Sequence, residues 1–568
     1  MIKKRKFEKY KYITVSASHI YNYMNNDHLV DWLKLYKKEA YCKDEFTDYI
    51  CNKGNEFEEK LINYIHSNKI PVQFVSKFIT DETCTTTINL MMQGVPLIFS
   101  APVKNPIDNT QGVIDILLRS DYIYRLVDTL GIEYETTIKA PNLNGDYHYV
   151  VIDIKFSSLK LKADGKHLLN IGKQPSYKAQ VKIYTDAIGY IQGYTCPYGF
   201  IMGRKYIYTG ASERTENNCL YTLGIIDYSS FDRDYIYSTQ KAIDWIRTVK
   251  SEGHLWSISP PSRTELYPNM CFDSGPWMNE KRRIAEEIKE ITLIWNCGTK
   301  NRNFAIYTNG IHSWDNINCS SSNMNISSNY SSTIDSIINI NHQQELNILP
   351  VQIQNNLYNW KTRENEIFLD FETVSDIFSD INIPIQNSTE IIFLIGVGFI
   401  NLEGVFEYKK FICNQLTNED ENRIMDEFSE FIVMKNYPKI YYWSAEPSIW
   451  KRAEIRNNRN RLNLNWCDLY FLFKTEPILI RNCLDYSLKS IAKAMKNHGM
   501  ISTSLDSNCT SGMIAMLNAW KYYIDLRSPV WDKNETRDET IMNDIILYNQ
   551  FDCKVLYEIL EYMRINMA

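Results

Sequence analysis

IFLDFET, residues 367–373, is the most informative stretch of this 568-residue chain. Its apolar residues flank Asp370 and Glu372, and on a strand these two carboxylates would point to the same face because side chains alternate. Like charges on one face of an apolar strand repel each other, and burying them without a partner is costly. A divalent metal ion offsets that cost, so the pattern predicts a metal-binding strand. The alternative is a half-exposed edge strand that carries two acidic residues.

Length and composition bound the kind of protein. A chain of 568 residues is long enough for three or four domains with ample core. Hydrophobic residues make up 44% and charged residues 23%, which is typical of a globular protein. The net charge of −6 argues against a protein that coats nucleic acid by bulk attraction. It is compatible with a metal-dependent nuclease, because such an enzyme gathers carboxylates.

Cysteine usage and apolar runs indicate where the protein works. The 13 cysteines include no C-x-x-C pair, so we expect neither a zinc ribbon nor an iron–sulfur cluster. Free thiols are typical of a reducing compartment, so we expect an intracellular protein of the cytoplasm or nucleus. The longest apolar run, residues 391–400, is too short to span a bilayer, and the basic start lacks the apolar region of a secretion signal. We therefore expect no membrane association.

The N-terminal third carries four predicted elements, each with one or two polar residues of interest. We expect a helix over residues 54–65, strands over 112–121 and 149–158, and a helix over 177–189. In the same order, their polar residues are Glu58, Asp115, Asp153 with Lys155, and Gln180 with Tyr184. Each has a structural explanation when taken singly: Glu58 suits a helix dipole, and Asp153 with Lys155 could form an ion pair on one strand face.

Taken together, G-x-x-x-E, a lone Asp, D-x-K and Q-x-x-x-Y over residues 10–210 resemble the RecB-family branch of PD-(D/E)XK nucleases. The ligands that this resemblance implies for Mg²⁺ or Mn²⁺ are Asp115, Asp153, the carbonyl of Ile154 and, completing or bracing them, Glu58. Lys155 would orient the attacking water and stabilise charge on the phosphate, while Gln180 and Tyr184 would position that lysine or the nucleic acid. Many relatives carry a cysteine cluster after the last helix; here Cys196 stands alone, so we expect none.

The middle of the chain contains one candidate nucleic-acid contact. Residues 280–316 resemble a weak helix-hairpin-helix repeat, which implies phosphate contacts by the backbone amide of Gly298 and by Lys300. A helical connector without such contacts is the equal alternative. Residues 319–336 are rich in Ser and Asn, so we expect a flexible linker or long loop there.

The C-terminal third also carries acidic residues on its predicted strands and helices. After the D-x-E strand we expect strands over 390–400 and 405–413, a helix from Thr417, and a strand that runs into a helix at Glu446. Near the end, Tyr548 and Asp552 lie four apart and so share one face of a predicted helix. In a plain reading, these two residues form only the solvated edge of that helix.

This order of motifs over residues 364–568 resembles the DnaQ-like, DEDD-type 3′–5′ exonucleases, which have an RNase H-like core. The resemblance implies that Asp370, Glu372, Asp552 and a middle carboxylate hold two Mg²⁺ ions about 4 Å apart, with Tyr548 aligning the attacking water. The middle motif departs from the usual N-x-x-F-D and reads W-S-A-E-P here. Glu446 is our candidate for it, and Asp468 is the fallback.

These inferences predict an α/β protein in three parts. They are a restriction-endonuclease-like PD-(D/E)XK domain over 1–260, a helical connector over 261–360, and an RNase H-like domain over 361–568. We expect a nuclease with two metal-dependent centres that acts on DNA ends or flaps during repair, recombination or replication. The alternatives are a nucleic-acid-binding scaffold with one or both centres degenerate, and an RNA-directed exonuclease. No G-x-x-x-x-G-K-[ST] phosphate loop occurs, so any unwinding would need a separate helicase.

Overall fold

The chain folds into two compact units. A computed structural model describes residues 10–210, 214–385, 390–460, 462–505, 507–509, 511–524 and 538–568. Unit 1 comprises Met1–Ile288 with Asp380–Asn387, and unit 2 comprises Lys289–Ser379 with Ser388–Ala568. The predicted connector over 261–360 is therefore divided between them. Its first part packs Ile284 into a core of unit 1, whereas Ile291 and Ile294 pack into the core of unit 2.

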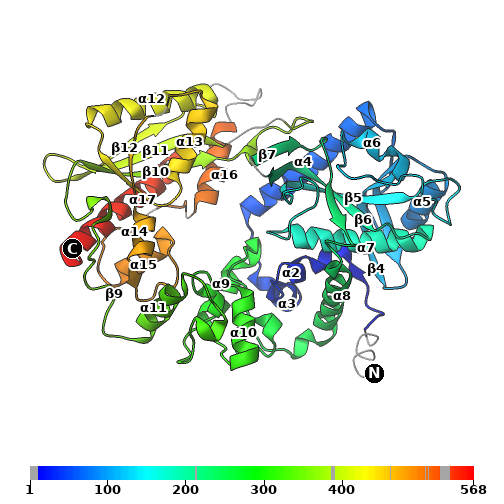
Figure 1. Cartoon of the computed structure of the whole chain (residues 1–568), viewed down its shortest axis with the longest axis horizontal. Helices are drawn as coiled ribbons and strands as arrows, with labels where there is room; N and C mark the ends of the chain where they lie inside the picture. The colour runs from blue at the N-terminus through cyan, green and yellow to red at the C-terminus, as the bar shows by residue number, and fades with distance from the viewer. Residues whose placement is uncertain are drawn as a thin grey trace. The chain divides into compact units, whose positions relative to one another are not determined.

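Unit 1 is built on a mixed eight-stranded sheet (Figure 1). Its strands are β1 (Val15–Ser16), β2 (Val72–Phe74), β3 (Leu97–Asn105), β4 (Thr110–Arg119), β5 (Tyr149–Lys160), β6 (Tyr198–Thr209), β7 (Arg214–Asn218) and β8 (Gly224–Asp227). Strands β2 to β7 lie in sequence order, β1 pairs with β4, and β8 pairs with β6. Neighbouring pairs from β3 to β5 are antiparallel, whereas β5 and β6 are parallel.

Helices cover both faces of this sheet. They are α2 (Tyr21–Met24), α3 (Leu29–Tyr36), α4 (Glu45–Asn68), α5 (Asp81–Met92), α6 (Ile123–Leu126), α7 (Gln174–Gln192), α8 (Asp234–Glu252) and α9 (Met278–Glu287). Val151 and Ile152, successive residues of β5, belong to opposite hydrophobic cores, as alternation on a strand requires. Helix α7 joins one core and α4 the other. The two predicted helices and two predicted strands of this region are thus confirmed as elements.

Unit 2 contains a five-stranded sheet in the order β12-β11-β10-β13-β14. These strands are β10 (Glu366–Val374), β11 (Ile391–Ile400), β12 (Phe406–Ile412), β13 (Lys439–Tyr442) and β14 (Asn465–Asp468). Strands β12, β11 and β10 pair antiparallel, and β10, β13 and β14 pair parallel. A separate ribbon joins β9 (Ile348–Leu349) to β15 (Leu479–Ile480). The predicted D-x-E strand is therefore the central strand of a sheet, not an exposed edge.

The helices of unit 2 pack around this sheet. They are α10 (Thr299–Asn309), α11 (Ser331–His342), α12 (Asn418–Met434), α13 (Glu446–Arg456), α14 (Leu469–Thr475), α15 (Leu488–Asn497), α16 (Gly512–Ile524) and α17 (Glu539–Asn566). Helix α17, red in Figure 1, contacts β10 and β11 and so carries its residues to the central strand. Of the helices described in either unit, none is both long enough and apolar enough to cross a membrane.

Of the two structures predicted for the Ser- and Asn-rich stretch 319–336, a flexible linker or a long loop, the structure shows a loop up to Tyr330 and then a helix. A short 3₁₀ turn covers Ser322–Met324, and α11 begins at Ser331. Ser321 donates its N–H and its hydroxyl to the carboxylate of Asp335, at 2.6 and 2.7 Å. Within α11, isoleucines at helical spacing are buried, including Ile334 and Ile338. A few well-spaced apolar residues thus outweigh the polar composition.

Candidate functional site

Unit 2 gathers four carboxyl groups from three elements, of which Glu372, Glu446 and Asp552 are buried and Asp370 is half-buried. Asp370 and Glu372 lie on β10, beyond the last residue that pairs with β13. Glu446 is the first residue of α13, directly after the junction that follows β13, and Asp552 lies on α17. The charges of Glu372, Asp552 and Glu446 all act on Asp370. The structure therefore brings together the residues that the sequence predicts as the C-terminal metal ligands.

Burial and mutual repulsion make these carboxyl groups hard to ionise. Burial first, then the charge of Asp552, raises the pKa of Glu372 to about 8. Burial also raises the pKa of Glu446 to about 8 and that of Asp552 to about 6. The pKa of Asp370 lies well above its ordinary value for the same reasons. The protein alone leaves this cluster short of positive charge, so a bound cation would favour its ionised form.

Two oxygens of the cluster are buried without a hydrogen-bond partner among the described residues. They are Oδ1 of Asp552 and Oε2 of Glu446. A donor set of carboxylate oxygens suits hard cations such as Mg²⁺. The described residues contain no group of three or more His, Cys, Asp or Glu side chains already close enough to hold a metal ion. The residue types and the orphaned oxygens thus fit a divalent cation, whereas the side-chain positions do not yet form a closed site.

Asn549 positions Asp370 and was not recognised in the sequence. Its Nδ2 donates to Oδ2 of Asp370 at 2.7 Å and to the Asp370 carbonyl at 3.2 Å. Its Oδ1 accepts a hydrogen bond from the Tyr408 hydroxyl at 2.8 Å. Gly396 pairs with Asp370 across the sheet, and a Cβ there would overlap Oδ1 of Asn549. The sequence signal was present, since Asn549 adjoins Tyr548 in the last motif and Gly396 interrupts an apolar strand.

Tyr548 and Lys489 adjoin the same cluster. The Lys489 ammonium lies 4.3 Å from the centroid of the Tyr548 ring. Burial, then the charge of Asp552, raises the pKa of Tyr548, so its hydroxyl stays protonated. Lys489 lowers the pKa values of Asp370 and Asp552 against the effect of burial. Lys489 lies on the first turn of α15, and helix periodicity alone does not assign this lysine to the carboxylates.

Asp468, the fallback for the middle motif, binds backbone instead. Its Oδ1 accepts the N–H of Ser444 and that of Phe471, each at 3.2 Å, and so caps α14. Ser444 lies in the junction before Glu446 and has a φ of 83°, a conformation that non-glycine residues rarely adopt. Asp468 therefore holds the turn that presents Glu446. Of the two alternatives, Glu446 is the one with an unpartnered oxygen at the cluster.

Unit 1 brings its predicted D-x-K motif beside Asp115. The Ile154 N–H donates to Oδ2 of Asp115 at 2.7 Å, and the Lys155 ammonium lies 2.6 Å from Oδ2 of Asp153. Burial, then the charge of Asp153, raises the pKa of Asp115 to about 7. Burial disfavours the charged form of Lys155, but Asp153 and Asp115 outweigh it and raise the pKa of this lysine. Lys155 is therefore a fixed positive charge between two carboxyl groups.

The remaining predicted residues of unit 1 surround this motif. Burial, then the charge of Asp115, raises the pKa of Glu58 on α4, whose carboxylate also pairs with Lys77 at 2.8 Å. On α7, Gln180 donates to the Tyr184 hydroxyl at 3.0 Å, and burial with the charge of Asp153 raises the pKa of that hydroxyl. A Cβ at Gly112 would overlap the Tyr184 ring, so this glycine lets the ring approach β4.

Tyr177 also faces the motif and was overlooked in the sequence. The Lys155 ammonium lies 5.4 Å from the centroid of the Tyr177 ring. Burial raises the pKa of Tyr177, and the charge of Lys155 partly opposes that rise. Tyr177 lies one turn before Gln180 on α7, so helical spacing from the predicted Q-x-x-x-Y pair could have drawn attention to it.

The predicted phosphate contact at Gly298 is occupied within the fold. The Gly298 N–H donates to Oδ1 of Asn301 at 3.1 Å, which closes the first turn of α10. Lys300, on the same turn, is exposed. Glu290, just before this segment, is buried and pairs with Arg302 at 3.4 Å. The segment thus has a structural explanation that does not involve a phosphate, because its glycine amide has a partner in the helix cap.

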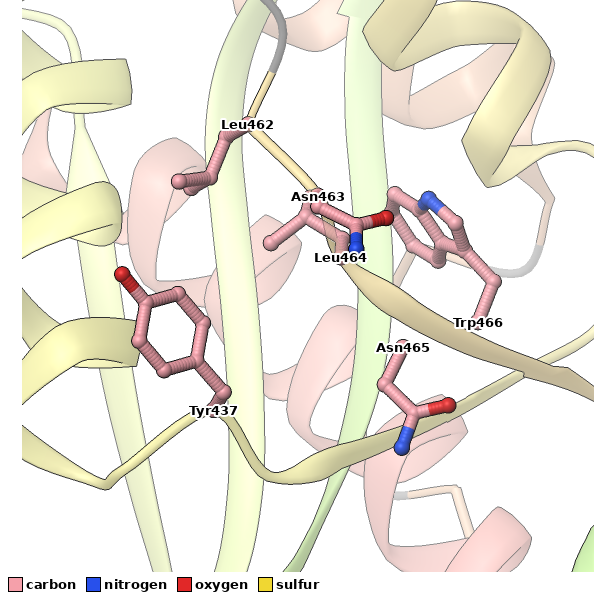
Figure 2. A pocket seen from close by; sticks show the side chains of 6 residues that line it. All are labelled: Tyr437, Leu462, Asn463, Leu464, Asn465 and Trp466. Atoms are coloured by element: carbon pink, nitrogen blue, oxygen red, sulfur yellow. The ribbon is translucent and has the colours of Figure 1, made fainter.

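A cavity of about 750 Å³ opens at the other end of the β13–β14 pair. Figure 2 shows Tyr437, which precedes β13, across from the segment that leads into β14. The lining residues are Tyr437, Leu462, Asn463, Leu464, Asn465 and Trp466. They include no charged side chain, and they lie at the amino ends of strands whose carboxyl ends lead to Glu446 and Asp468. This cavity is therefore distinct from the carboxylate cluster.

Comparison with known proteins identifies the C-terminal region. A family model of the RNase H superfamily, RNase_H_2, matches residues 367–564, which include Asp370, Glu372, Glu446 and Asp552. No curated protein matches the chain. A domain of this superfamily indicates a nuclease-like function, and RNase H-like nucleases generally use divalent metals such as Mg²⁺. Residues 367–564 are thus an RNase H-like domain of the nuclease type.

Proposed function

We propose that this protein is a metal-dependent nuclease with two phosphodiester-hydrolysing centres, one in each unit, that acts on DNA. The observation that carries the proposal is the cluster on an RNase H-like sheet of half-buried Asp370 with the buried residues Glu372, Glu446 and Asp552. Carboxylates that cannot all ionise without a cation are costly to maintain, and metal binding gives them a function.

The centre in unit 2 is a candidate 3′–5′ exonuclease. Asp370, Glu372, Glu446 and Asp552 would hold Mg²⁺ or Mn²⁺, which when bound supplies Lewis-acid stabilisation of phosphate charge and a more acidic water. Asn549 orients Asp370 through two hydrogen bonds. The Tyr548 hydroxyl, kept protonated by its raised pKa, can align the attacking water by hydrogen bonding.

The centre in unit 1 is a candidate PD-(D/E)XK nuclease. Asp115 and Asp153 would hold the metal ion, with Glu58 beside them. The raised pKa of Lys155 keeps its ammonium charged near neutral pH, so it can stabilise negative charge that develops on the phosphate. Gln180 and Tyr184, which are hydrogen-bonded to each other, would position Lys155 or the nucleic acid. This assignment rests on the residue pattern and on the contacts of Asp115 and Lys155.

The proposed setting is DNA processing inside the cell. The thirteen cysteines all carry free thiols, as suits a reducing compartment. DNA ends or flaps in repair, recombination or replication are the proposed substrates, and a separate helicase would expose them where unwinding is needed. The nucleic-acid substrate itself follows from the nuclease domain.

The test is hydrolysis of labelled single- and double-stranded DNA and RNA with Mg²⁺. The variants are Asp153→Ala, Asp370→Ala and the double variant, with the exposed acids Asp128→Ala and Glu403→Ala as controls in units 1 and 2. Each single variant should lose the activity of its own unit. Because loss of a residue that only supports a metal ligand costs about 10- to 100-fold, loss of a ligand itself should reduce the rate by more than that. The double variant should lose both activities, and the controls should match wild type.

Three results would contradict the proposal or its substrate. Wild-type hydrolysis by the double variant would exclude both centres. Absence of hydrolysis in the wild type, with nucleic acid bound but no carboxylate-dependent Mn²⁺ binding by calorimetry, would instead support a scaffold. Selective cleavage of the RNA strands would show that the substrate is RNA and not DNA.

A further inference from the structure

A pocket at the edge of the unit 1 sheet adjoins the carboxylates of that unit. It has a volume of about 370 Å³ and lies between α4 and the β2–β3 edge. Its lining residues are Asn55, Glu58, Glu59, Ile62, Asn63, Phe74, Lys77 and Phe99. Only Glu58 among them belongs to the predicted catalytic residues, so the remainder of the pocket has no role in the reaction described above.

One wall of this pocket is an aromatic ring that is open to solvent. Phe74 ends β2, the edge strand, and its side chain is 54% exposed. The ring meets the buried ring of Phe99 edge-on, with 5.6 Å between their centroids. The edge-on contact with Phe99 fixes the orientation of the Phe74 ring. A half-exposed phenylalanine beside a cavity can bind a ligand against the face of its ring.

The register of the unit 1 sheet places this pocket next to Asp115. Phe99 on β3 pairs with Ile116 on β4, one residue after Asp115. Ser100 follows with a φ of 56°, and it lies opposite Asp115, because the pairing skips one residue on each strand without a shift of register. At the other side of the pocket, Glu58 experiences the charge of Asp115 and is paired with Lys77. A ligand in the pocket would therefore be held beside Asp115.

The charges of the pocket favour a neutral flat ligand over a phosphate. Glu58 and Glu59 would repel an anion inside it, whereas the amide groups of Asn55 and Asn63 can bond the polar edge of a nucleobase. The Lys77 ammonium lies 5.8 Å from the centroid of the Phe99 ring, and the Lys77 side chain, 61% exposed, supplies positive charge at the pocket. Base stacking on exposed aromatic side chains beside a cation is how proteins bind single strands.

We propose that this pocket binds one unpaired nucleobase of a single strand, stacked on Phe74, with the adjoining phosphate near Lys77. The proposal rests on the proposed nuclease function of unit 1 and defines its substrate as single-stranded ends or flaps. A base inside a duplex is stacked on both faces and could not enter the pocket without being extruded.

The test measures binding without divalent metal, in EDTA, so that no hydrolysis occurs. Phe74→Leu keeps an apolar side chain but removes the ring, and Phe231→Leu is the control because Phe231 is 55% exposed elsewhere in unit 1. Phe74→Leu should weaken binding of a fluorescent oligothymidylate by about 5- to 100-fold. It should not change binding of the corresponding abasic strand or of a blunt duplex, and Phe231→Leu should change none of them.

A local readout separates this pocket from other binding surfaces. In Phe74→Trp, oligothymidylate should quench the added tryptophan fluorescence, measured as the difference from wild type, and the abasic strand should not. Oligouridylate in the same assay distinguishes RNA from DNA strands. Absence of quenching, with Phe74→Leu binding like wild type, would overturn the proposal. Failure of Asp153→Ala to alter hydrolysis would overturn the nuclease assignment of unit 1 but leave this binding result standing.

Discussion

At the scale of single residues, Lys489 supplies positive charge to the carboxylate cluster of unit 2. It lowers the pKa values of Asp370, Glu372 and Asp552 against the effect of burial. A protonated carboxyl group cannot bind a metal ion, so metal binding is lost as pH falls through the pKa values of the free cluster. Lys489 should therefore set the lower pH limit of metal binding.

We expect Lys489→Met to shift the midpoint of Mn²⁺ binding to higher pH. Without the ammonium, the pKa values of the carboxyl groups, already about 6 for Asp552 and about 8 for Glu372, rise further. The protonated form then persists to higher pH, and Mn²⁺ must displace more protons. Calorimetric titrations from pH 6 to pH 9 measure the shift. Lys493→Met, an exposed lysine on the same helix, is the control, and identical curves for the two variants would contradict the prediction.

At the scale of elements, β11 and α17 cooperate to orient the central strand. Gly396 leaves space on β11 through which Asn549 of α17 reaches Asp370 on β10. Any side chain at this position would displace the asparagine or force the helix away from the sheet. The glycine is therefore required by the packing of α17, not by its own backbone conformation.

We expect Gly396→Ala to reduce both stability and hydrolysis by unit 2. Overpacking of this kind costs about 1–3 kcal/mol, which urea unfolding can measure. Adding Asn549→Ala should restore part of the stability by removing the overlap, but not the hydrolysis, because Asp370 still lacks its partner. The control is Gly512→Ala, since a Cβ there would meet no described atom within 4 Å. Recovery of hydrolysis in the double variant would show that Asn549 does not position Asp370.

Sequence and structure agree on the elements of unit 2 and differ on the contacts that join them. The strand carrying Asp370 and the helix carrying Tyr548 were predictable because their periodicity is strong and local. The partnership of Asn549 with Gly396 was not, because it joins residues far apart in the chain. The prediction of a linker or loop over 319–336 fails only from Ser331, where α11 begins, because a composition argument neglects the isoleucines that this helix buries at helical spacing. Local patterns thus identify elements, whereas the contacts that orient a site depend on tertiary packing.

At the scale of the whole molecule, the boundary between units does not follow the order of the chain. Asp380–Asn387, which lies between β10 and β11 in sequence, belongs to unit 1. Ile381 is buried in the same core as Phe57 and Leu61 of α4. The domain boundaries predicted at residues 260 and 360 do not include this exchange of a segment, because the hydrophobic pattern of a short loop does not specify which core the loop joins. Unit 1 is therefore completed by a segment that the sequence of unit 2 supplies.

This arrangement predicts that a substitution within the span of the RNase H-like domain loosens the other unit. Ile381→Ala should cost about 2 kcal/mol or more of the stability of unit 1, as loss of a buried isoleucine side chain does. Hydrogen exchange followed by mass spectrometry should show faster exchange in peptides from α4 and unchanged exchange in β10 and β11. Leu402→Ala, which removes a fully exposed side chain from unit 2, is the control and should alter neither. If α4 exchanges as in wild type while β10 loosens, the 380–387 segment stabilises unit 2 instead, and the two units would each be completed by their own stretch of chain.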